Sequence, residues 1–205
     1  QEDTNGDHFI GRREFRAEAQ FHLAEPHLQE ARRNSAGELD LAGVEVPAAQ
    51  ILGDGEVLAW LTSRRAVGLA AFQLGVLERA LALTAEYART REQFDRPIGS
   101  FQAVSQRLAD DYIDIKGLRL TLDQASWRLS EGLPADVEVA TAAFWAAEAG
   151  HRVAHTTVHV HGGVGIDMDH PVHRYFITAK QTEFALGGAT AALRIIGRDL
   201  ADTPA

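Results

Sequence analysis

The sequence contains no cysteine. Disulfides, thiolate nucleophiles and cysteine-ligated zinc or iron–sulfur sites are therefore excluded, and the chain is compatible with a reducing cytoplasm. An excess of basic residues is also lacking, because 29 Asp and Glu outnumber 20 Lys and Arg and give a formal net charge of −9. We therefore expect no broad electrostatic surface for nucleic acid or anionic lipid.

Long apolar runs are missing as well. Residues 1–8 are polar, and no uninterrupted apolar stretch approaches the roughly 20 residues of a membrane span. We expect neither a signal peptide nor membrane insertion, and we assign the chain to the cytoplasm. Its 205 residues, 45% of them hydrophobic, can bury one substantial core.

Hydrophobic periodicity divides the sequence into three parts. Residues 1–37 are polar and rich in charge, whereas apolar residues alternate around a glycine in residues 38–55, as at the end of a β segment. In residues 56–205 the apolar positions recur at three- and four-residue steps, which is typical of helices. Three breaks divide this part into four long helices: Asp95–Gly99, Gly132–Pro134 and Gly162–Gly165. We predict an all-α fold, an antiparallel four-helix bundle preceded by a short β remnant.

The densest functional signal lies between the first two predicted helices. Arg89, Arg91 and Arg96 are followed by a turn and the start of a new helix. Cationic side chains beside free helix N–H groups favour binding of an anion such as a phosphate. Cations at a helix C-terminus also complement the helix dipole, so the residues alone leave both interpretations open.

A glycine-rich turn follows the third predicted helix. Gly162 and Gly163 allow a ligand to approach the backbone closely, although the same residues can serve simply as a helix C-cap. The turn does not match the dinucleotide-binding fingerprint, because no strand precedes it.

Two patterns raise the question of a metal. His151, His155 and His159 step by four residues and share one helical face, as zinc ligands can, although no acidic residue lies within this row. A ligand groove or a protein interface explains the same row without zinc.

The other pattern lies near the start of the chain. Oxygen ligands fall at the first, third, fifth and twelfth positions of a loop over residues 3–14, which resembles an EF-hand calcium loop. These ligands are Asp3, Asn5, Asp7 and Glu14. His8 stands where such a loop needs glycine, and a solvated acidic segment is the alternative.

Three segments, in this order, resemble the C-terminal helical domain of acyl-CoA dehydrogenases: Arg91–Gln102, His161–Ile166 and Pro171–Lys180. The resemblance covers about residues 38–205. It implies that residues 38–55 are a remnant of the family's middle β domain, and that the family's N-terminal helical domain is missing.

The resemblance also implies FAD as cofactor, bound in part across a subunit boundary. His159 stands where the family more often has glutamine, and Gly162 and Gly163 match the loop at the flavin adenine and pyrophosphate. The FAD-contacting positions fall on Arg91, Phe94, Gln102, His159, Gly162 and Gly163.

Family chemistry is α,β-dehydrogenation of an acyl-CoA: a carboxylate removes the α-proton while hydride passes to the flavin. The usual glutamate position falls on Leu186 and the alternative position on Arg65, and neither side chain can accept the proton. Glu183 is the nearest substitute, but it lies almost one helical turn before Leu186. We therefore predict no catalytic residue in this chain.

These features predict an FAD-binding subunit that assembles with a homologous catalytic subunit into a heterotetramer, or with itself as a homo-oligomer, to act on an acyl-CoA. The segment Glu183–Thr190 resembles the paired subunits of actinobacterial enzymes that shorten steroid side chains, which implies a steroid substrate. The alternative is a non-enzymatic helical interaction module that responds to calcium or zinc.

Overall fold

The computed structural model describes residues 47–51, 53 and 55–202. The predicted polar segment 1–37, its EF-hand-like loop with Asp3, Asn5, Asp7 and Glu14, and most of the predicted β remnant lie outside the described residues. The chain divides after Arg64 into two units.

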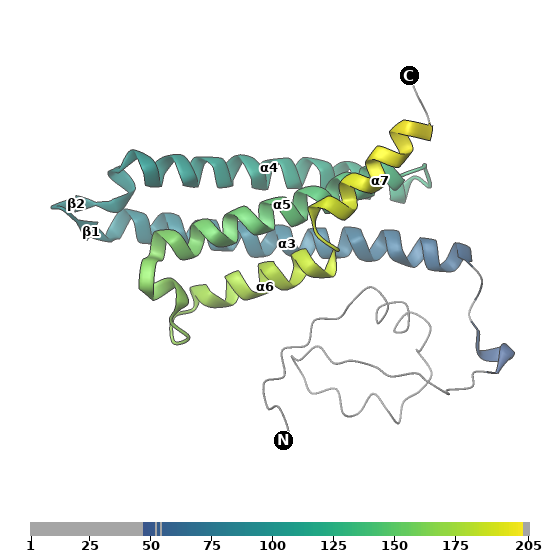
Figure 1. The fold of residues 1–205 in the computed structure, drawn as a ribbon, viewed down its shortest axis with the longest axis horizontal. Coiled ribbons are helices and arrows are strands. Elements are labelled where there is room, and N and C mark those ends of the chain that lie inside the picture. Colours follow the sequence, from purple (N-terminus) through teal and green to yellow (C-terminus); the bar gives the residue numbers. More distant parts are fainter. Residues whose placement is uncertain (1–46, 52, 54, 203–205) are drawn as a thin grey trace. The chain divides into compact units, whose positions relative to one another are not determined.

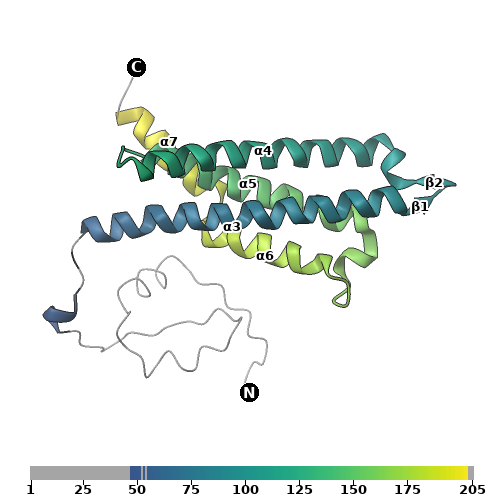
Figure 2. The ribbon, with the colours of Figure 1, turned by 180° about the vertical axis from the view of Figure 1, so that it is seen from behind.

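Helices dominate the described part of the chain. Its elements are, in order, η1 (Ala48–Gln50), α3 (Gly55–Thr90), β1 (Glu92–Gln93), β2 (Arg96–Pro97), η2 (Ile98–Ser100), α4 (Gln102–Ser130), α5 (Asp136–His161), η3 (Gly162–Ile166), α6 (Val172–Ala185) and α7 (Ala189–Asp202). From Arg65 onward, α3 runs beside α5 and α6, with α4 on the other side of α5, as both views show (Figures 1 and 2). The prediction of an all-α bundle is confirmed.

The predicted fourth helix contains a break. α6 ends at Ala185, and α7 begins at Ala189 and packs on α5. Gly187 and Gly188 adopt φ values of 84° and 77°, a left-handed conformation that other residues rarely adopt. These two glycines turn the chain between the two helices.

The core of the second unit is built from the inner faces of α3, α4, α5 and α6. Its buried members are Ala70, Leu74, Leu77, Ala80, Ile115, Leu118, Leu122, Ala146, Ala149, Val153, Ala154 and Ala179. Many of them are alanines, especially on α5, and small side chains allow neighbouring helices to approach closely. The spacing of these residues follows the three- and four-residue pattern of the sequence.

One buried polar side chain ties three helices together. Gln73 on α3 donates hydrogen bonds from Nε2 to the carbonyl oxygens of Ala146, at 3.2 Å, and Ala179, at 3.0 Å. A Cβ atom on Gly150 would lie 2.0 Å from this nitrogen. Glycine at position 150 therefore makes room for the Gln73 amide.

A short hairpin joins α3 to α4. Glu92 pairs with Pro97 and Gln93 with Arg96 in an antiparallel ladder. The two turn residues, Phe94 and Asp95, have φ values of 55° and 60°, as a two-residue hairpin turn of type I′ requires.

Helix α3 is long and apolar enough to cross a membrane by length and composition alone. The core helix of a bundle passes the same test, and from Ala70 onward α3 contributes buried residues to the bundle core.

Candidate functional site

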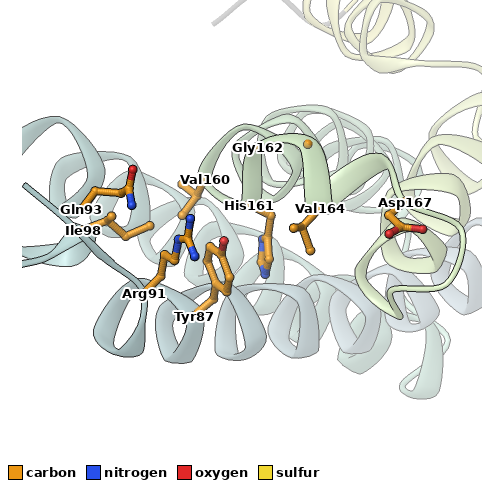
Figure 3. Close-up of a pocket in the computed structure, with 10 residues that line it drawn as sticks. Tyr87, Arg91, Gln93, Ile98, Val160, His161, Gly162, Val164 and Asp167 are labelled. Atoms are coloured by element: carbon orange, nitrogen blue, oxygen red, sulfur yellow. The ribbon is translucent and has the colours of Figure 1, made fainter.

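A pocket of about 550 Å³ opens where the C-terminal ends of α3 and α5 meet the hairpin and η3. Ten residues line it: Tyr87, Arg91, Gln93, Ile98, Val160, His161, Gly162, Gly163, Val164 and Asp167. Figure 3 shows Arg91, Gln93 and Ile98 toward one end, Tyr87 and His161 in the middle, and Asp167 at the other end. The volume lies in the range of small-molecule sites.

Two stacked rings form the middle of this pocket. The rings of Tyr87 and His161 lie 4.3 Å apart between centroids at an interplanar angle of 22°. Nδ1 of His161 lies 2.8 Å from the carbonyl oxygen of Thr157, so we assign the ring hydrogen to this nitrogen. Burial lowers the pKa of His161, an effect that the Thr157 carbonyl opposes and His170 reinforces. The ring is therefore mainly neutral at pH 7, with Nε2 as a hydrogen-bond acceptor.

Arg91 supplies the positive charge of the pocket. Its backbone N–H donates to the carbonyl oxygen of Tyr87 and its own carbonyl accepts from Ile98 N–H, both at 2.8 Å. The chain is thus fixed on both sides of this residue. Among the lining residues, Arg91 alone carries a permanent positive charge, so an anionic group entering the pocket would pair with it.

The glycine loop ends helix α5 and also contributes to the lining of the pocket. Gly162 has a φ of 64°, ends α5 and lines the pocket. A Cβ atom on Gly163 would meet nothing within 4 Å, which leaves its backbone accessible from the pocket side. Gly165 has a different role, because a Cβ atom there would lie 2.8 Å from the carbonyl oxygen of Val158.

Three of the six predicted FAD-contacting residues line this pocket, namely Arg91, Gly162 and Gly163. The other three, Phe94, Gln102 and His159, are exposed and lie outside its lining. Phe94 occupies the tip of the hairpin, where it is 87% exposed and contacts Phe101 edge to face. The sequence analysis missed the stacked pair of Tyr87 and His161, although His161 directly precedes the glycine loop.

Leu186 and Arg65, the two positions where the sequence analysis predicts the family's base, come together at the C-terminal end of α6. Leu186 follows the last residue of α6 and packs, half-buried, against the core. Nη2 of Arg65 donates a hydrogen bond to the carbonyl oxygen of Ala185 at 2.8 Å.

Glu183, the nearest substitute for the base, accepts a hydrogen bond from Nζ of Lys180 at 2.6 Å and lies 3.4 Å from Nδ1 of His151. Its carboxylate is engaged by these partners.

The histidine row lies beside this cluster. The rings of His151 and His155 are 4.5 Å apart, and His155 packs edge to face on Phe176. Within residues 47–51, 53 and 55–202, no group of three or more histidine or acidic residues is arranged to hold a metal ion. The zinc interpretation of His151, His155 and His159 therefore finds no site there.

Comparison with known proteins places this geometry in context. The sequence model of one protein family, the acyl-CoA dehydrogenase C-terminal domain, matches residues 53–201. The acyl-CoA dehydrogenase FadE27 of Mycobacterium tuberculosis is 68% identical over 179 residues, which cover 83% of this chain and 48% of the relative. The chain thus spans about half the length of this curated relative.

Solved structures show the same similarity. The ChsE4–ChsE5 complex from M. tuberculosis contains a chain that is 72% identical with a TM-score of 0.77, covering 80% of this chain and 44% of its own length. A variant of the Tcur3481–Tcur3483 steroid acyl-CoA dehydrogenase is 46% identical with a TM-score of 0.68, covering 70% and 40%.

Proposed function

Because the chain belongs to the acyl-CoA dehydrogenase family, we propose that it is the non-catalytic, FAD-binding subunit of a heteromeric acyl-CoA dehydrogenase of the cytoplasm. The observation that carries this proposal is the combination of a pocket lined by Arg91 and two glycines with Leu186 and Arg65 at the two positions where we expect the family's base.

The residues of the pocket fit part of an FAD molecule. Arg91 suits a pyrophosphate, and the accessible backbone at Gly162 and Gly163 suits close approach of a nucleotide. The Tyr87–His161 pair offers aromatic surface, and a neutral His161 adds no charge beside it. A bound flavin would accept the hydride that leaves the acyl chain.

The pocket alone would not complete the reaction, because the α-proton needs a base. Leu186 has no ionisable group, and the guanidinium of Arg65 is protonated and bonded to the Ala185 carbonyl. Glu183 is held by Lys180 and His151. We therefore assign proton removal to a carboxylate of a homologous partner subunit.

The relatives support the nature of that partner and of the substrate. The ChsE4–ChsE5 structure is a complex of two different proteins, and the Tcur3481–Tcur3483 protein is a steroid acyl-CoA dehydrogenase. We accordingly propose assembly with a homologous catalytic subunit and an acyl-CoA with a steroid side chain as substrate.

Co-expression with candidate homologous subunits tests the proposal. The purified complex should show flavin absorbance and reduce an artificial electron acceptor when a steroid-side-chain acyl-CoA is added. Each subunit expressed alone should carry less flavin, because the pocket described here is only one part of the cofactor site. A complex without flavin, or without turnover on any acyl-CoA, would contradict the proposal.

A further inference from the structure

His161 is the only histidine among the residues that line the pocket. Histidine is the side-chain type whose charge ordinarily changes between about pH 5 and 8. The residue is 5% exposed and occupies the middle of the lining, between Arg91 toward one end and Asp167 at the other (Figure 3). A proton gained by His161 therefore changes the charge of the pocket at its centre.

The contacts of His161 fit both charge states of its ring. Nδ1 lies 2.8 Å from the carbonyl oxygen of Thr157 and donates its hydrogen there, so a second proton would be added at Nε2 and this bond would persist. The Tyr87 ring lies 4.3 Å away between centroids at an angle of 22°, and the face of an aromatic ring attracts a cation. Protonation of His161 thus breaks neither of these two contacts.

The neighbouring His170 has a different set of contacts. Its ring lies 5.5 Å from that of His161 between centroids, and its Nδ1 accepts a hydrogen bond from the backbone N–H of Val172 at 3.3 Å. Val172 is the first residue of α6, so a positive charge on His170 would forfeit this bond and face the positive end of the helix dipole. A proton taken up beside the pocket is therefore favoured on His161.

An anion in the pocket would favour the charged form of His161. Within the protein itself, burial lowers the pKa of His161, the Thr157 carbonyl opposes this effect and His170 reinforces it. An anionic group paired with Arg91 would offset the guanidinium charge and bring negative charge into the pocket, which raises the pKa of His161 again. By linkage, a ligand that favours the protonated ring is itself bound more tightly when the ring is protonated.

On the basis of the proposed function, we propose that His161 is a second, proton-dependent binding residue for FAD, which takes up a proton at Nε2 when the pyrophosphate of FAD pairs with Arg91. The protein then holds FAD more tightly as the pH falls through the pKa that His161 has with FAD bound. The gain levels off below the pKa of His161 without FAD, which burial places below 6.5. Between these two pKa values, one proton raises the affinity by at most about tenfold per pH unit.

The experiment measures the FAD dissociation constant of the complex with the homologous catalytic subunit at about pH 6 and pH 8. The pyrophosphate diester of FAD does not titrate in this range, so a pH dependence belongs to the protein. We expect FAD to bind about threefold more tightly, or better, at the lower pH. Isothermal titration calorimetry in two buffers of different ionisation enthalpy should show a net uptake of protons when FAD binds.

Two variants test the assignment to His161. His161→Phe keeps a ring against Tyr87 but cannot ionise, so its FAD affinity should be equal at the two pH values and its proton uptake should vanish. His161→Gln, which is neutral and lacks the ring, should behave in the same way. Circular dichroism and the melting temperature verify the fold of each variant.

Two matched controls separate His161 from other titrating groups. His170→Gln removes the neighbouring histidine, and Asp111→Asn removes a buried carboxyl outside the pocket lining whose pKa is raised to about 7. Both controls should keep the pH dependence of the unaltered chain.

An FAD affinity of the unaltered complex that is independent of pH, without proton uptake, overturns the inference and leaves the proposed function standing. An equal pH dependence in the unaltered chain and in His161→Phe or His161→Gln also overturns it. So does a pH dependence that only His170→Gln removes, because the proton then belongs to His170. A complex that binds no FAD at either pH removes the proposed function and this inference together.

Discussion

Arg65 donates a hydrogen bond to the carbonyl oxygen of Ala185, the residue that precedes Leu186. Arg65 thus bonds to the residue beside Leu186, and Leu186 itself packs against the core. The bond closes the C-terminal end of α6, whose last carbonyl groups have no partner within the helix. Arg65 therefore has a structural role here.

Arg65→Met should lower stability without affecting catalysis. Loss of a bond from a charged donor to a partly buried carbonyl costs about 1–2 kcal/mol, because the Ala185 oxygen must find water instead. The melting temperature of the chain should fall, while turnover by the assembled complex should stay constant. Arg119→Met, which removes a surface ion pair with Glu78, is the control with little expected effect. Loss of turnover at full stability would assign Arg65 a catalytic role.

Arg91 should determine how tightly the complex holds FAD. Arg91→Ala removes the permanent positive charge from the pocket lining, and we expect FAD affinity to fall by about 10- to 100-fold, as for loss of a charge-assisted contact. Arg96→Ala is the matched control, since the Arg96 guanidinium lies 4.0 Å from the centroid of the Phe101 ring and outside the lining. The flavin released when each complex is serially diluted into buffer gives the FAD dissociation constant of both variants. Equal losses in the two variants would place the cofactor elsewhere.

Helix periodicity predicted the bundle, and the family motifs predicted three of the ten residues that line the pocket. The helices follow from apolar spacing, a local property, and Arg91, Gly162 and Gly163 belong to short segments that can be recognised directly. The stacking of Tyr87 on His161 depends on how the ends of α3 and α5 meet, which no local pattern encodes.

The structure differs from the sequence-based prediction at two turns. The residues that cause each turn are visible in the sequence, but their pattern alone does not predict the turn. Gly187 and Gly188 interrupt the apolar period only briefly, yet their left-handed backbone ends α6. Phe94 and Asp95 form a hairpin turn without glycine. Aspartate tolerates positive φ, whereas phenylalanine does so rarely, so composition alone favours an irregular loop at this point.

Replacing glycine by alanine at two helical positions should change the free energy of unfolding in opposite directions. Gly150→Ala places a Cβ atom 2.0 Å from Nε2 of Gln73 and displaces its bonds to Ala146 and Ala179, so we expect destabilisation by about 2–4 kcal/mol. A Cβ atom on Gly75, an exposed position of α3, would meet nothing within 4 Å. Gly75→Ala should therefore raise the free energy of unfolding by about 0.5–1 kcal/mol. Urea unfolding measures both changes, and a neutral Gly150→Ala would show that Gln73 has room to move.

Asp111 makes the stability of the chain depend on pH. Burial raises the pKa of Asp111 to about 7 from 3.8, and the nearby Asp114 adds to the effect, whereas a hydrogen bond with Thr156 and the charge of Arg152 oppose it. The folded state therefore prefers the neutral acid, whereas above pH 4 the unfolded chain ionises it. The stabilisation from the bound proton is complete below the unfolded pKa and is lost progressively as pH rises from about 4 to about 7.

Asp111→Asn keeps a neutral side chain at every pH and should remove this dependence. At pH 8 the variant should be more stable than the unaltered chain by up to about 4 kcal/mol, and at pH 4 the two should be nearly equal. Asp110→Asn on the exposed side of α4 is the control and should show no comparable gain. Urea unfolding of the chain at pH 4, 6 and 8 measures the differences. A constant difference between Asp111→Asn and the unaltered chain across this range would show that Asp111 stays ionised in the folded state.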